Sequence, residues 1–183
     1  MSWENLCNYI TLARIVSVPL IALLFLFPYS QSIGWYLFIL AWISDLLDGY
    51  IARAFGFVTK IGGLLDSYAD KVLVITCLML LSILGKLPNF IASIAAIVIV
   101  LRELLVFLLK LASYLMNIEL GVSKGAKLKA FLQMLSIALL FCRGFVAQSV
   151  GFITLLLAAV LSITTALEYY WFFVYQKTYP SLP

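Results

Sequence analysis

The aspartates are the residues whose type and spacing could do chemistry in this sequence. All four lie in the stretch DLLDGYIARAFGFVTKIGGLLDSYAD, residues 45–70, between two long apolar runs. In helices, Asp45 and Asp48 would share one face at i, i+3 spacing, and Asp66 and Asp70 would share one face at i, i+4 spacing. Carboxylates are costly at membrane depth, so we expect these four to form one polar site.

The spacing also predicts that the two aspartate pairs lie at matched depth. Counted from Arg53 and Lys60 at the expected membrane edge, at about 1.5 Å per residue, both pairs lie roughly 8 to 15 Å deep and can face each other across a hairpin. Two divalent cations would balance four carboxylates. Hard oxygen ligands, without histidine or paired cysteine, favour Mg²⁺ or Mn²⁺ over zinc. A network of buried salt bridges or an ion pathway in a transporter are the alternatives.

The composition indicates that helices in a membrane position these residues. Of the 183 residues, 65% are hydrophobic and only 11% are charged, which excludes an ordinary soluble domain. The net charge of +4 comes from basic residues beside apolar runs, so anionic lipid and topology explain it better than nucleic acid does. We therefore expect an all-α integral membrane protein that forms a single domain over residues 1–183, with no nucleic-acid partner.

Hydropathy predicts six transmembrane helices, at about residues 8–27, 33–53, 60–83, 88–116, 126–147 and 150–174. An even number of spans places both termini on one side. Basic residues decide which side that is. The proposed cytoplasmic side would hold Arg14, Arg53, Lys60, Lys110, Lys124, Lys127, Lys129 and Lys177, against Lys86 and Arg143 outside. Both termini are therefore predicted to be cytoplasmic.

The spacing of the aspartate stretch resembles the signature of the CDP-alcohol phosphotransferase family. The pattern reads DxxDG, two residues, AR, eight residues, G, three residues, D, three residues, D. The resemblance implies a six-helix membrane fold, usually a homodimer, with a two-metal site near the cytoplasmic surface. Family members transfer a phosphatidyl or similar group from a CDP-linked donor to an alcohol and release CMP.

The resemblance also implies roles for single residues. Asp45, Asp48 and Asp66 would be metal ligands, and Asp70 would be a further ligand and the general base. The CDP-donor site would be lined by Gly49, Ala52, Arg53 and Gly62.

Outside the signature, the sequence resembles one branch of that family, the bacterial phosphatidylglycerophosphate synthases. NYITLARIVSVP matches their N-terminal pattern at Asn8, Thr11, Arg14 and Pro19, and TKIGGLLDSYADKVLV and GAKLKAFLQM resemble two further stretches. Three positions depart from that pattern: Ser67 stands in place of proline, Ala126 separates Gly125 from Lys127, and Ala130 replaces threonine. This likeness implies sn-glycerol 3-phosphate as the acceptor, CDP-diacylglycerol as the donor, and the bacterial inner membrane as the location.

An acceptor that is a phosphate monoester needs a cationic pocket. The candidates are Arg102, Lys124, Lys127, Lys129 and Arg14. Arg102 lies roughly 21 Å from the far side of the membrane, near the depth of the aspartates, but it could equally form a buried salt bridge with an acid such as Glu103. The lysines could instead serve only to fix the topology. A cardiolipin synthase, or a family member that uses inositol phosphate or serine, remains an alternative. An ion transporter is the alternative outside the enzymes.

Overall fold

The structure is a computed structural model that describes residues 16–55, 60–116, 124–142 and 144–178. In the stretches 45–55 and 60–67, and at Lys124, Lys177 and Thr178, it describes the backbone conformation but not the side-chain environment.

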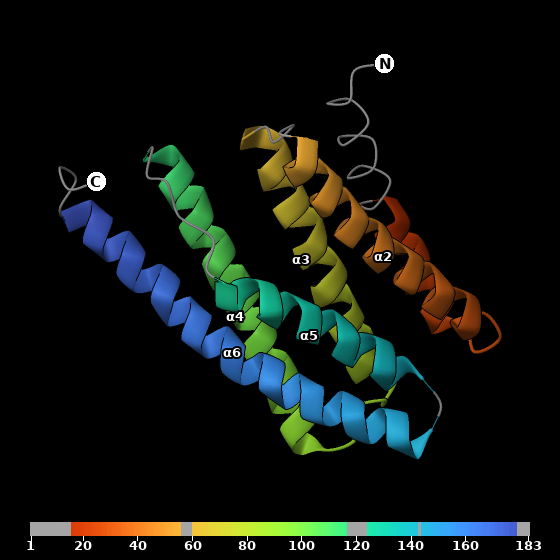
Figure 1. Ribbon diagram of the computed structural model, residues 1–183. Helices are drawn as coiled ribbons and strands as arrows, with labels where there is room; N and C mark the ends of the chain where they lie inside the picture. The colour runs from red at the N-terminus through yellow and green to blue at the C-terminus, as the bar shows by residue number, and fades with distance from the viewer. Residues whose placement is uncertain (1–15, 56–59, 117–123, 143, 179–183) are drawn as a thin grey trace. The chain divides into compact units, whose positions relative to one another are not determined.

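The described residues form six helices and contain no strand (Figure 1). A first helix covers Val16–Leu26. It is followed by α2 (Gln31–Phe55), α3 (Lys60–Ile83), α4 (Phe90–Leu115), α5 (Lys124–Phe141) and α6 (Phe145–Thr178). The predicted all-α fold is confirmed for this part of the chain. The expected start of the first span, at residue 8, lies outside the described residues.

The helix boundaries agree with the hydropathy for α2, α3 and α4 and differ for the last two helices. α5 ends at Phe141 and not at 147, and α6 begins at Phe145 and not at 150. The turn between them therefore lies earlier in the sequence than predicted, at Gly144, which adopts φ 151°, a conformation that is costly for residues with a Cβ. The residues after Gly144 therefore enter α6 directly.

Two helix ends follow from local sequence. Gly85, with φ 62°, donates its N–H to Ser82 O at 3.1 Å, and Lys86 N–H donates to Leu81 O at 2.9 Å. This pair of bonds is the glycine-dependent Schellman motif that ends α3. At the start of α4, Asn89 Oδ1 accepts the N–H of Ala92 at 2.9 Å, a normal helix N-cap.

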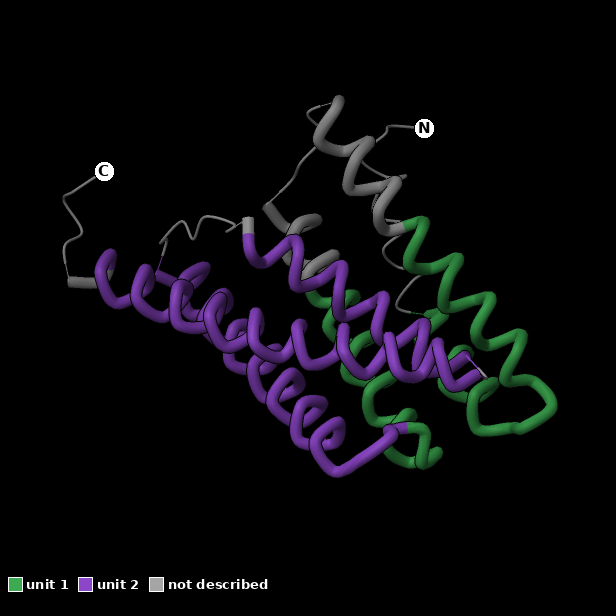
Figure 2. Tube along the Cα trace, turned by 60° about the horizontal axis from the view of Figure 1, so that its bottom comes forward, with its two compact units in different colours: residues 1–86 green, residues 87–183 purple. Residues whose placement is uncertain are grey.

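The chain divides into two compact units, of which the first is Met1–Lys86 (Figure 2). Within it, the helix Val16–Leu26 approaches α2 closely at Gly34. A Cβ added to Gly34 would lie 3.2 Å from Leu24 Cβ. The side chains of Phe25 and Phe38 are fully buried. This unit contains both helices that carry the aspartates.

The second unit is Leu87–Pro183, in which α6 packs against both α4 and α5 (Figure 2). Its core is made of aliphatic side chains from the three helices, including Ile99, Ile137, Leu140 and Leu155. α5 and α6 come closest at Gly151, where an added Cβ would lie 3.1 Å from Leu139 Cβ and 3.2 Å from the Leu140 backbone nitrogen. A small residue at this position allows the two helices to touch.

Two helices in the described part of the chain are long and apolar enough to cross a membrane. They are Phe90–Leu115, with 26 residues, and Phe145–Gln176, with 32 residues. At about 1.5 Å per residue, each exceeds the roughly 30 Å of a bilayer's hydrocarbon core. Large apolar side chains are exposed along both helices, among them Leu101, Leu108, Leu157 and Val160. Such a surface suits contact with lipid.

Candidate active site

The predicted aspartates lie on the two helices expected to carry them. Asp45 and Asp48 lie in α2, and Asp66 and Asp70 lie in α3. The prediction that both pairs lie in helices is therefore confirmed for the backbone. Asp70 is half-buried, whereas the side chains of the other three lie outside the described residues. How the two pairs face each other stays a prediction.

The residues expected to line the CDP site are also placed by their backbone. Gly49, Ala52 and Arg53 lie in the C-terminal half of α2, and Gly62 lies in the first turn of α3. Their side-chain surroundings lie outside the described residues. Among the described side chains, which do not include those of Asp45, Asp48 and Asp66, no group of three or more His, Cys, Asp or Glu could hold a metal ion.

The predicted basic residue of α4, Arg102, is buried and held by three hydrogen bonds. Its Nε donates to Ser162 O at 3.2 Å, its Nη2 donates to Thr165 Oγ1 at 2.8 Å, and its Nη1 donates to Glu103 Oε1 at 3.2 Å. Only 7% of Arg102 and 4% of Glu103 is exposed. The ion pair predicted as an alternative for Arg102 is therefore present. A role in phosphate binding stays a prediction.

Lys129 of α5 reaches the same carboxylate. Its Nζ donates to Glu103 Oε1, and only 4% of Lys129 is exposed. One oxygen of Glu103 thus joins the Arg102 guanidinium to the Lys129 ammonium. We call Arg102, Glu103 and Lys129 the buried charge cluster; it connects α4, α5 and α6.

Of the other predicted phosphate-binding residues, Lys127 has a described side chain, and it takes no part in this cluster. Lys127 is exposed on α5. Lys124 is the first residue of α5, but its side chain lies outside the described residues, as does Arg14.

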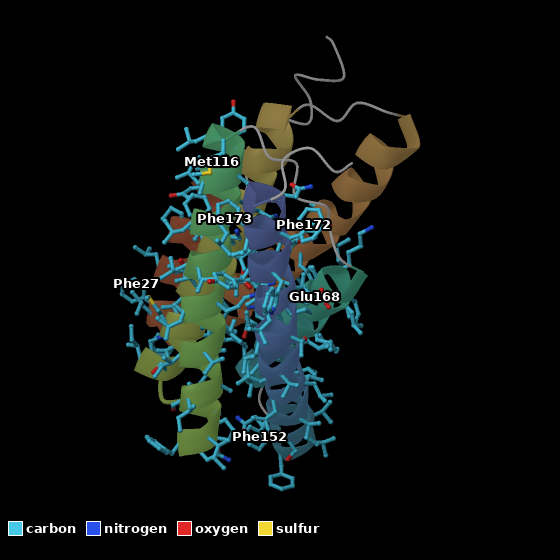
Figure 3. The ribbon with its side chains drawn as sticks, turned by 90° about the vertical axis from the view of Figure 1, so that its left-hand side faces the viewer. Phe27, Met116, Phe152, Glu168, Phe172 and Phe173 are labelled. Atoms are coloured by element: carbon cyan, nitrogen blue, oxygen red, sulfur yellow. The ribbon has the colours of Figure 1, made fainter. Side chains whose placement is uncertain are left out.

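Sequence reasoning missed the α6 residues that contact Arg102. Ser162 and Thr165 are fully buried and one turn apart on α6. Figure 3 shows the same face further along α6, where Phe173 lies on the side of α4 while Phe172 and Glu168 lie on the opposite side. Tyr169 of this face lies under Lys110 of α4, with Nζ 5.9 Å from the ring centroid. The sequence feature that could have indicated these contacts is the i, i+3 spacing of Ser162 and Thr165, two polar residues within an apolar run.

The buried charge cluster carries one net positive charge, because two cations contact one carboxylate. Two buried polar atoms of the same unit, Gln133 Nε2 and Ser162 Oγ, have no hydrogen-bond partner among the described residues. Buried polar atoms are normally paired, and buried charges are normally balanced. In charge and in hydrogen-bonding capacity, this part of the core therefore matches an anionic group that has several oxygen atoms.

The chain is similar to one protein family over most of its length. A sequence profile described as CDP-alcohol phosphatidyltransferase matches residues 4–166. This match includes the whole aspartate stretch and the buried charge cluster.

Individual relatives match over most of their length. A protein of Rickettsia typhi named CDP-diacylglycerol–glycerol-3-phosphate 3-phosphatidyltransferase is 42% identical over 176 residues, which cover 91% of this chain and 96% of the relative. The protein of the same name from Rickettsia bellii is 41% identical and covers 91% and 94%. A probable phosphatidylglycerophosphate synthase of Mycobacterium tuberculosis is 33% identical and covers 90% and 79%. Together with the composition and the two spanning-length helices, this similarity identifies a membrane protein.

Proposed function

Because the chain belongs to the CDP-alcohol phosphatidyltransferase family, we propose that it transfers the phosphatidyl group of CDP-diacylglycerol to sn-glycerol 3-phosphate. The products are phosphatidylglycerophosphate and CMP, so the protein acts in phospholipid biosynthesis. The observation that carries this proposal is the similarity to relatives named for this reaction, at 41% and 42% identity across 91% of the chain.

We assign a pair of divalent cations, Mg²⁺ or Mn²⁺, to the four aspartates of α2 and α3. The donor set fits these ions, because it consists of carboxylate oxygens from Asp45, Asp48, Asp66 and Asp70 on two neighbouring helices in sequence. When bound, the cations would neutralise the donor's diphosphate and the charge that develops on the transferring phosphoryl group.

The chain's own residues supply the proton transfer and the binding of the donor. Asp70 accepts the proton of the acceptor hydroxyl, whose oxygen then attacks the phosphorus of the phosphatidyl group. The bond from this phosphorus to the bridging oxygen of the diphosphate breaks, and CMP leaves with that oxygen. Gly49, Ala52, Arg53 and Gly62 line the CDP site, where glycine and alanine leave the helix backbone open to a ligand.

Cationic side chains would bind the acceptor's phosphate. Arg102 and Lys129 of the buried charge cluster are the central pair, with Lys124, Lys127 and Arg14 as further contributors. The net positive charge of the cluster supports this role, because a phosphate monoester is an anion that matches it. A phosphatidylglycerol acceptor, as in a cardiolipin synthase, would need less positive charge.

The proposal includes the placement of the protein in a bacterial inner membrane. Six spans would put both termini in the cytoplasm, because the basic residues of the sequence gather on that side. The active site would face the cytoplasm, where water-soluble glycerol 3-phosphate meets the membrane-anchored donor. A homodimer is the proposed assembly.

Release of CMP from CDP-diacylglycerol by the purified protein, measured with a panel of acceptors, tests the proposed function. With Mg²⁺ or Mn²⁺ present, we expect CMP release only when glycerol 3-phosphate is added, and we expect chelation of the metal to stop it. Release with phosphatidylglycerol, inositol phosphate or serine in its place would overturn the acceptor assignment. No release with any acceptor would favour a non-enzymatic role such as ion transport.

A further inference from the structure

The two cations of the buried charge cluster, Arg102 and Lys129, are held by hydrogen bonds to neighbouring residues, and Thr165 is the first of these residues. The Thr165 hydroxyl donates its hydrogen to Leu161 O at 2.7 Å, the carbonyl one turn earlier in α6. A hydroxyl has one hydrogen, so toward Arg102 Nη2 at 2.8 Å it can act only as an acceptor. Thr165 thus fixes one end of the guanidinium against α6.

The second fixed partner is Glu103. Its Oε1 accepts hydrogen bonds from both Arg102 Nη1 and Lys129 Nζ, so it sets the spacing of two cations that would otherwise repel each other. Lys129 comes from α5, whereas Arg102 and Glu103 are neighbours on α4. The carboxylate therefore holds an ammonium group beside a guanidinium across two helices.

Buried charges are usually balanced, and buried polar atoms are usually paired. Here the contacts leave one positive charge over, and Ser162 Oγ and Gln133 Nε2 have no partner among the described residues. Ser162 belongs to the cluster's surroundings because its carbonyl accepts from Arg102 Nε. Gln133 lies one helical turn beyond Lys129 on the same face of α5. Unbalanced charge and unpaired donors together point to an anionic ligand that carries oxygen atoms.

We propose that Thr165 and Glu103 are positioning residues that hold Arg102 and Lys129 in place to bind the phosphate of the acceptor. This inference rests on the proposed function and extends it to α6, a helix for which the sequence predicted no role. Arg102 and Lys129 touch the phosphate, whereas Thr165 and Glu103 act through them.

The test replaces Thr165 with valine, which keeps the shape of the side chain and removes the hydroxyl. In full-length protein, we expect Thr165→Val to raise the KM for glycerol 3-phosphate about tenfold, the effect of one hydrogen bond to a charged group. The KM for CDP-diacylglycerol should not change. Thr165→Ser keeps the hydroxyl and should retain the wild-type KM for both substrates.

The chain offers a matched control in Thr154. It is also buried on α6, and its hydroxyl also donates to a helix carbonyl, that of Val150, at 2.9 Å, but no contact with Arg102 is present. Thr154→Val removes the same kind of intrahelical bond and should leave both KM values unchanged. A rise in acceptor KM that is specific to Thr165→Val therefore reports on positioning and not on a general loosening of α6.

A second variant, Glu103→Asp, keeps the charge but withdraws the carboxylate from Lys129, and it should also raise the KM for glycerol 3-phosphate alone. As a readout without turnover, glycerol 3-phosphate should raise the thermal unfolding temperature of the wild type and of Thr165→Ser, and do so less for Thr165→Val. Wild-type protein that releases no CMP with glycerol 3-phosphate would refute the proposed function. If the wild type is active but the variants change neither KM, or change both equally, the positioning role is wrong.

Discussion

The ionic side chains of the second unit show what a buried charge needs in this protein. Arg102 and Lys129 are both more than nine-tenths buried, and both contact Glu103. Removing one member of a buried pair leaves an uncompensated charge, which usually costs more than the pair itself contributes. The buried charge cluster is thus weak evidence for added stability, and its excess positive charge is consistent with the proposed phosphate ligand.

Asp70 is the single residue on which the proposed chemistry depends most. Asp70→Asn removes the group that takes the proton, while the amide has nearly the same size as the carboxyl group. Because general-base catalysis contributes about 10²- to 10⁴-fold, we expect CMP release to fall by at least this factor while the protein elutes as a folded species from detergent.

The control for this change is Asp70→Glu, which keeps a carboxylate and should retain more activity than the amide. Near-normal turnover by Asp70→Asn would exclude Asp70 as the base. Equal loss in both variants would point to the exact position of the oxygen atoms as the requirement, and not to the proton transfer.

Among the helices, α6 has two different faces along its length, one buried and one exposed. Ser162, Thr165 and Tyr169 are buried and face α4, whereas Leu157 and Val160 are exposed and apolar. The helix has 34 residues, about 51 Å at 1.5 Å per residue, so it extends well beyond a hydrocarbon core of roughly 30 Å. α6 therefore combines a lipid-compatible face with a polar contact to the buried charge cluster.

The contact of α5 with α6 at Gly151 gives a prediction about helix packing. A valine at this position would bring its Cβ within 3.1 Å of Leu139 Cβ and Leu140 Cγ and within 3.2 Å of the Leu140 backbone nitrogen, which cannot move without the helix. Overpacking of this kind typically costs about 1 to 3 kcal/mol, so we expect Gly151→Val to lower the thermal unfolding temperature in detergent.

Val160→Ile enlarges a side chain of α6 that is 60% exposed, and it should leave the unfolding temperature unchanged. If Gly151→Val is as stable as Val160→Ile, the close approach of the two helices is not required for folding.

Helix boundaries show where sequence patterns suffice and where they do not. α2, α3 and α4 were predicted closely because apolar runs there end at clear signals such as Gly85 and Asn89. The turn between α5 and α6 was predicted after residue 147 but lies at Gly144, and the residues that follow Gly144 suit a helix as well as a loop. Composition alone does not distinguish these two outcomes.

For the molecule as a whole, some residues of the candidate site could be predicted from the sequence and others could not. The spacing of the aspartates could be interpreted from the sequence because, within each pair, it depends only on the period of one helix. The family match also covers that stretch. The partners of Arg102 on α6 could not be predicted, because Ser162 and Thr165 contact it only as a result of the packing of α4 against α6. Contacts between distant segments depend on helix rotation, which hydropathy does not determine.

The central claim concerns the whole molecule in its membrane: a lipid donor and a soluble phosphate ester are joined into one lipid. The most direct measurement supplies radiolabelled glycerol 3-phosphate and CDP-diacylglycerol to the purified protein in lipid nanodiscs and follows the label. We predict that the label enters the organic phase as phosphatidylglycerophosphate, in an amount equal to the CMP released and only when the donor is present. CMP release with all of the label left in the aqueous phase would contradict the account.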